Sequence, residues 1–149
     1  TYFVNGSYIG QERADRTFPI NCFFKAGIKL ANSSDYPITA VPNPFVGIEI
    51  GVTRIAPDNY HPWVFDYSDP KFHKPLWPEE CATVTDMIDS FTINQAYANF
   101  VDDISGSLEV GKSADVIVVD KNILHIEAAD IGTEKKEKTF FRGQIVYQG

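Results

Sequence analysis

The segment from Gly27 to Pro37 places the tightest constraint on how this chain can fold. Residues Ile28–Ala31 are mostly apolar, as in a short buried strand, and Gly27 and Pro37 interrupt regular structure on either side. The first charged residue of the loop that follows is Asp35. Asp35 is therefore predicted at the carboxyl end of the strand, the edge at which α/β sheets and barrels bind ligands. We interpret it as a candidate functional residue.

The same carboxylate has a simpler interpretation as a turn residue. Asp35 follows two serines and precedes Tyr36-Pro37, and serine, aspartate and proline are residues that tight turns favour. The local sequence alone favours the turn. The choice therefore depends on what the rest of the chain resembles.

Helices and strands are predicted on both sides of this segment. The apolar periodicity predicts helices over 17–26, 45–55 and 79–100, and strands over 107–110, 115–120 and 139–147, the last folded at a tight turn over 142–144. Residues 10–16 are polar enough for an exposed or site-lining loop. Residues 56–78, rich in proline and aromatic residues, are predicted to form a long irregular excursion. The pattern indicates an α/β body followed by a small β element.

Composition bounds the classes of function. The chain has 149 residues, the length of one domain, and a net charge of −7. A nucleic-acid partner is not expected, because such proteins carry a basic face. No apolar run approaches the length of a membrane span, so no membrane partner is expected. Cys22 and Cys81 lack metal-type spacing, and we expect free thiols in a reducing, cytoplasmic compartment.

Residues 106–113 match the phosphate-binding pattern G-x-x-x-x-G-K-[ST] letter for letter. A functional P-loop needs a strand before it and a helix after it, so that backbone amides at the helix N-terminus hold the phosphates. Here the predicted helix comes first and the strand second, and Glu109 would place a negative charge in the cradle. We interpret the stretch as a turn between two strands and expect no nucleotide binding.

Several motifs together resemble those of a known family. Residues 90–98 and 106–120 resemble the C-terminal signature of the metal-dependent amidohydrolase superfamily. The branch they resemble most is amidohydrolase family 3, which includes N-substituted formamide deformylase-like proteins. Two upstream motifs, within residues 10–27 and 34–54, agree with it and stand in the family's order. The resemblance therefore covers nearly the whole chain.

The resemblance implies an α/β fold, the C-terminal fragment of a (β/α)8 TIM barrel with part of a small β-sandwich. Residues 28–34 would be the eighth barrel strand, and the chain would divide into a barrel part, 1–103, and a sandwich part, 104–149. Asp35 falls on the family's catalytic and metal-binding aspartate, which takes a proton from metal-bound water and passes it to the leaving nitrogen. The implied activity is metal-dependent hydrolysis, with zinc the first choice, of carbon–nitrogen bonds other than peptide bonds in small amide or formamide-like substrates.

The chain departs from the family in its length and its histidines. A barrel takes about 250 residues, and the family's His-x-His and other ligand histidines precede the aspartate. Here His61, His73 and His125 all follow Asp35, and we interpret them as surface or packing residues. We therefore expect a fragment that binds no metal and is inactive alone, although its complete parent is an enzyme. Barrel surfaces left exposed would favour a homo-oligomer.

A non-enzymatic α+β binding module is the alternative. In that case Asp35 is structural, and the aromatic residues from Trp63 to Trp77 form a surface for a partner. The two hypotheses differ in what they predict upstream of Thr1, because only the enzyme needs a strand ending in His-x-His. The residues that bind substrate are not assigned, since most would lie outside this sequence.

Overall fold

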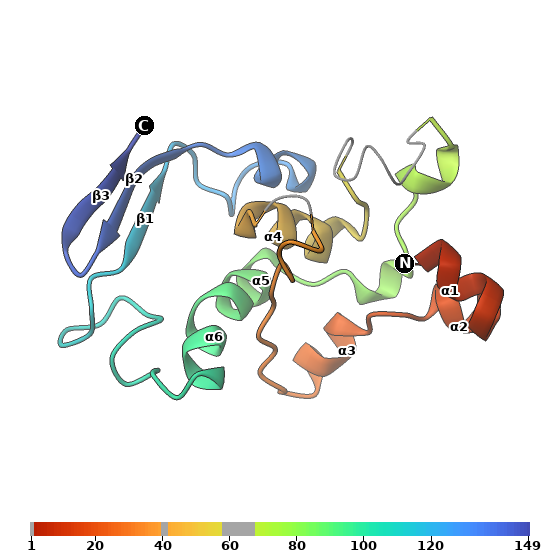
Figure 1. The fold of residues 1–149 in the computed structure, drawn as a ribbon, viewed down its shortest axis with the longest axis horizontal. Helices are drawn as coiled ribbons and strands as arrows, with labels where there is room; N and C mark the ends of the chain where they lie inside the picture. Colours follow the sequence, from red (N-terminus) through yellow and green to blue (C-terminus); the bar gives the residue numbers. More distant parts are fainter. Residues whose placement is uncertain (1, 40–41, 58–67) are drawn as a thin grey trace.

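The computed structural model describes residues 2–39, 42–57 and 68–149. Within these ranges the chain has six α-helices, three 3-10 helices and three strands. They are α1 (Tyr2–Ile9), α2 (Gln11–Asp15), α3 (Ile20–Lys25), α4 (Pro44–Thr53), η1 (Pro70–His73), η2 (Pro78–Glu80), α5 (Val84–Phe91), α6 (Ile93–Ala98), β1 (Val116–Val119), η3 (Ala128–Thr133), β2 (Lys136–Phe141) and β3 (Gln144–Gln148). The sheet lies at one end of the molecule and α1 and α2 at the other, with α4 and α5 between them (Figure 1). The fold is mixed α/β.

The N-terminal residues are helical, where a loop over residues 10–16 was predicted. α1 and α2 pack against each other, and Gly10 between them has a φ of +85°, a left-handed value that lets the chain reverse. Gln11 Nε2 donates to Asp15 Oδ1 at 2.7 Å across one turn of α2, and Ala14 is fully buried. The loop prediction is wrong because a five-residue helix is too short to show an apolar period.

The helix predicted over residues 17–26 forms but begins later. Phe18 has a φ of +60°, which is not helical, so α3 starts only at Ile20. Gly27 ends this segment as predicted, with a φ of +73°. The helix therefore has six residues, too few to be stable without the contacts it makes with η2.

The helix predicted over residues 45–55 is confirmed as α4. Its two glycines, which weaken an isolated helix, face α5. A Cβ at Gly47 would lie 2.5 Å from Phe91 Cζ, and a Cβ at Gly51 would lie 2.3 Å from Met87 Cε. The missing side chains thus let two large side chains of α5 pack directly on the backbone of α4.

The single helix predicted over residues 79–100 is divided into η2, α5 and α6. Thr83 caps α5, because its Oγ1 accepts a hydrogen bond from the Asp86 amide at 3.1 Å. Thr92 separates α5 from α6: its φ of −125° and ψ of −95° are not helical, and its Oγ1 donates to Ile88 O at 2.8 Å. The apolar period continues across this break, so it did not reveal the division.

No strand forms over residues 28–34, contrary to the prediction. Residues 28–35 have no regular secondary structure, and they run past α5 and α6 as a single irregular segment (Figure 1). Ile28 is about half exposed, so the segment is not buried either. A strand needs a neighbour to accept its backbone hydrogen bonds, and the described residues supply none. They accordingly form no parallel barrel sheet.

The sheet is antiparallel in the order β1–β2–β3. β1 and the β2–β3 hairpin confirm the strands predicted over 115–120 and 139–147, whereas residues 107–110 form no strand. The turn predicted over 142–144 is also confirmed. Arg142 and Gly143 both have positive φ, 51° and 77°, as a tight type I′ hairpin turn requires.

The core joins the helices to the segment around the sheet. Its buried residues are Phe45, Ile48, Ala82, Met87 and Ile131. Ile131 belongs to η3, which packs on α4, so residues on both sides of the predicted 103/104 boundary share one core. The division into 1–103 and 104–149 stays a prediction.

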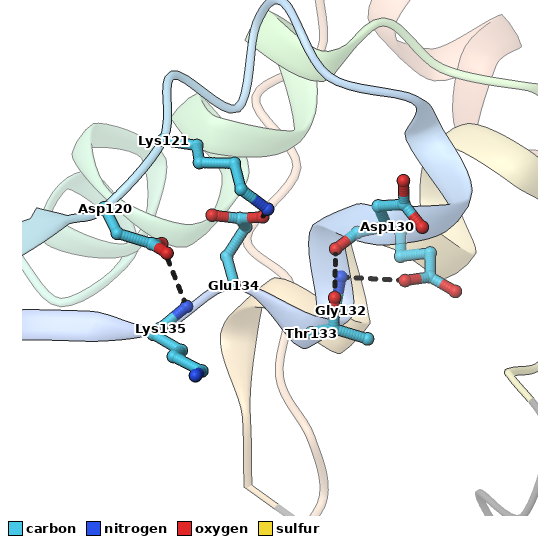
Figure 2. A network of polar contacts seen from close by, with 8 residues as sticks. Asp120, Lys121, Asp130, Gly132, Thr133, Glu134 and Lys135 are labelled. Atoms are coloured by element: carbon cyan, nitrogen blue, oxygen red, sulfur yellow. Dashed lines mark hydrogen bonds and ion pairs between the residues drawn. The ribbon is translucent and has the colours of Figure 1, made fainter.

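Polar contacts hold η3 in place beside this core (Figure 2). The Gly132 amide donates to Glu49 Oε2 at 2.7 Å, and burial raises the pKa of the Glu49 carboxyl although that hydrogen bond opposes the shift. Lys121 Nζ lies 3.2 Å from Glu134 Oε1, whose side chain is buried, and this pairing raises the pKa of the lysine. Neither carboxylate was singled out by the sequence.

Candidate functional site

Asp35 lies at the end of the irregular segment, in a tight turn. Its φ of +54° is left-handed, and its carbonyl accepts a hydrogen bond from the Ile38 amide at 2.8 Å. The Asp35 amide donates to Ser33 Oγ at 3.2 Å, so a serine of the predicted turn stabilises it locally. The geometry of the turn interpretation is therefore present. A turn does not by itself decide whether the carboxylate has a chemical role.

The carboxylate of Asp35 is exposed and makes no hydrogen bond or ion pair with the described part of the chain. The same residues contain no group of three or more histidine, cysteine, aspartate or glutamate side chains that could hold a metal ion. His73 and His125 are both exposed and belong to no such group. His61 falls outside the described residues. Asp35 thus offers a single free carboxylate.

An open groove of about 1460 Å³ lies beside this turn. Its lining is mainly apolar, and residues of α4, α5 and the irregular segment contribute to it. Ser33 and Ser34 line the groove from the segment, and Arg54 and Trp77 line it as well, whereas Asp35 is not part of the lining. Residues 58–67 of the predicted excursion over 56–78, including Trp63, lie outside the described residues.

Arg54 holds three segments together at the groove. It ends α4 with a φ of +59°, and its side chain is 8% exposed. Nε donates to Leu76 O at 2.9 Å and Nη2 donates to Thr17 O at 3.0 Å. Burial lowers the pKa of the guanidinium, and the nearby Cys81 and Glu80 oppose the shift. The sequence contained only a weak signal for this role, an arginine directly after an apolar helix.

Asn32 is a second residue whose position the sequence did not reveal. Its amide donates to Ser90 O at 3.1 Å, and its Nδ2 donates to Ser90 Oγ at 2.8 Å. Its carbonyl accepts a hydrogen bond from Gln95 Nε2. Asn32 therefore fastens the irregular segment to α5 and α6, three residues before Asp35. No sequence pattern predicts this contact, because its partners are about 60 positions away.

Two further findings concern the cysteines and the helices. Cys22 and Cys81 are free, as predicted. Among the described residues, no helix has the length and apolar character that crossing a membrane requires.

The sequence is similar to members of one family over nearly its whole length. A sequence model of the amidohydrolase family matches residues 2–147. The chain is 24% identical over 133 residues to N-substituted formamide deformylase of Arthrobacter pascens. The aligned region covers 89% of this chain and 22% of the deformylase. It is 31% identical over 115 residues to Protein LONG AFTER FAR-RED 3 of Arabidopsis thaliana, covering 76% of this chain and 17% of that protein. The chain thus spans about a fifth of these curated relatives.

The fold is also similar to a solved structure. An amidohydrolase from Thermotoga maritima MSB8 superposes with a TM-score of 0.53 at 19% sequence identity. The match covers 87% of this chain and 26% of that protein. At this identity the likeness concerns the fold, and it is a likeness to a part of a larger enzyme.

Proposed function

Because this chain belongs to the amidohydrolase family, we propose that it is the C-terminal part of a metal-dependent hydrolase of carbon–nitrogen bonds other than peptide bonds. The family match over residues 2–147 is the observation that carries the proposal. The name of one relative, N-substituted formamide deformylase, supports a small amide or formamide-like substrate. The activity is proposed for a complete protein, since the chain spans only about a fifth of that relative.

In this proposal Asp35 is the catalytic and metal-binding carboxylate. It is exposed and free within the described residues, and an ionised carboxylate can accept a proton from water and return it to a leaving nitrogen. The described residues do not complete a metal site. The remaining ligands would therefore come from outside the described residues. A bound divalent metal, zinc in the first place, supplies an activated water in enzymes of this kind.

The test is made on the complete hydrolase and on the chain alone. Asp35→Asn in the complete hydrolase is expected to lower kcat by about 1000-fold or more, because it removes a group that transfers protons. Asp103→Asn, a matched change at another exposed aspartate, should leave kcat unchanged. The 149-residue chain should bind no zinc tightly by titration calorimetry. Full activity in the Asp35→Asn enzyme would favour the alternative, a binding module in which Asp35 is structural.

We also propose that the isolated chain is cytoplasmic and self-associates. Large apolar side chains are exposed on and near the irregular segment, among them Ile28, Tyr36 and Ile38. Light scattering after size-exclusion chromatography is expected to give a mass above 16.7 kDa that rises with concentration. Replacing Ile38 with serine should shift the population toward monomer. A monomer at every concentration would contradict the proposal.

A further inference from the structure

We propose that Asn32 is a positioning residue, which sets the place of Asp35 by fastening the segment before it to α5 and α6. The inference rests on the proposed function, in which Asp35 acts on substrate. It concerns a different residue, Asn32, which lines the groove beside Ser33 and Ser34 and is inferred to act on Asp35 through the backbone. Three hydrogen bonds carry it, and all of them involve Asn32.

The first step is that residues 28–35 lack the support that a strand receives. No strand among the described residues pairs with them, so no ladder of backbone hydrogen bonds fixes their course. Asn32 provides a substitute, because its amide donates to Ser90 O and its carbonyl accepts from Gln95 Nε2. Both backbone polar groups of this one residue are thus satisfied by helices.

The second step is that the side chain of Asn32 holds the segment at the same position. Asn32 Nδ2 donates to Ser90 Oγ at 2.8 Å, and Ser90 is fully buried. Ser90 Oγ in turn donates to Met87 O at 2.7 Å, so its proton is directed away from Asn32 and its lone pair toward it. An amide donor of this length is what the site requires. Aspartate, of the same size, has no proton to donate when it is ionised.

The third step links this anchor to Asp35. Only Ser33 and Ser34 lie between Asn32 and Asp35, and Ser33 Oγ accepts a hydrogen bond from the Asp35 amide. Because only two residues connect them, the position of Asn32 restricts the position of Asp35. Loss of the Asn32 hydrogen bonds should therefore make the Asp35 turn more mobile. Groups that orient a ligating or catalytic side chain typically affect affinity or activity by about 10-fold to 100-fold.

The first measurement uses the 149-residue chain. In Asn32→Ala, the 15N heteronuclear NOE of Ser34 and Asp35 is expected to fall, and the Asn32-position amide should exchange at least about 10-fold faster. Lys29→Ala is the matched control, because it removes a contact of the same segment with α6, the cation–π pair of Lys29 with Tyr97 at 3.9 Å, but none of these hydrogen bonds. Unchanged order at Asp35 in Asn32→Ala would overturn the inference.

The second measurement separates this inference from the proposed function. In the complete hydrolase, Asn32→Ala and Asn32→Asp should lower kcat by about 10-fold and displace the acid limb of the pH profile, with KM within about two-fold. Gln95→Ala should show a smaller effect of the same kind, and Lys29→Ala none. If Asp35→Asn is inactive while both Asn32 variants keep wild-type kcat and pH profile, the positioning role is wrong and the proposed function stands. If Asp35→Asn is active, the proposed function fails.

Discussion

Arg54→Ala is expected to lower the free energy of unfolding by about 2–4 kcal/mol, the loss of two hydrogen bonds from a charged donor. The guanidinium donates to Leu76 O and Thr17 O, which belong to segments far apart in the sequence. Truncation leaves the Leu76 and Thr17 carbonyls without this donor, at a position where Arg54 is only 8% exposed. Urea unfolding followed by circular dichroism measures the change, provided that the slope with denaturant stays constant.

Two variants define the control for this result. Arg16→Ala removes an exposed arginine whose ion pair, within the described residues, is with Glu12 at 3.8 Å, so a change within about 0.5 kcal/mol is expected. Arg54→Lys keeps the charge but cannot donate in two fixed directions, so it should fall between wild type and Arg54→Ala. Equal effects of Arg54→Ala and Arg16→Ala would show that the buried contacts do not stabilise the fold.

Gly106→Ala is expected to cost about 2–4 kcal/mol, from backbone strain and overpacking together. Gly106 has a φ of +89°, which an L-residue rarely adopts. A Cβ there would also lie 2.6 Å from Ala96 Cβ and 3.1 Å from Ile93 Cα, so it would meet α6 at places that cannot rotate away. Thermal and urea unfolding of the variant measure the loss.

Gly111→Ala provides the matched comparison within the same phosphate-binding pattern. Gly111 has a φ of +99°, but nothing lies within 4 Å of the position of a Cβ. Only the backbone strain remains, and the expected cost is about 1 kcal/mol. Equal costs at the two glycines would contradict this account.

Residues 106–113, which match the phosphate-binding pattern, have a different structural context from a P-loop. Lys112 Nζ donates to Ser107 Oγ at 2.7 Å and lies 3.2 Å from Glu109 Oε1, so the lysine of the pattern is already paired. No helix follows the motif, and the next element is β1. The predicted turn between two strands is present only in part: residues 110–111 form a turn and β1 follows, but the first expected strand, 107–110, does not form.

Local patterns in the sequence predicted those elements whose stability is local. The apolar period of α4 and the Arg142-Gly143 turn depend on residues within a few positions of one another. The break at Thr92 was missed because the apolar face continues from α5 into α6. Residues 28–34 were predicted as a strand from their composition, but a strand forms only where a partner lies alongside.

The candidate site was predictable only as far as one residue. Motifs resembling those of amidohydrolases singled out Asp35, and its role stays a prediction. Neither Asn32 nor Arg54 carries a local signal, because Asn32 meets Ser90 and Arg54 meets Thr17 and Leu76 only after folding. Glu49 likewise acquires its raised pKa from burial against η3.

The sequence by itself determined the family, the hairpin and the acidic residue to which the functional hypothesis refers, because these depend on the identity and spacing of neighbouring residues. Only the tertiary structure decided that the segment before Asp35 has no strand partner among the described residues and is fastened at Asn32, and that α4 and α5 pack through glycines. Those features depend on contacts between residues far apart in the chain. Burial and hydrogen-bond partners are set by such contacts, and a local pattern does not contain them.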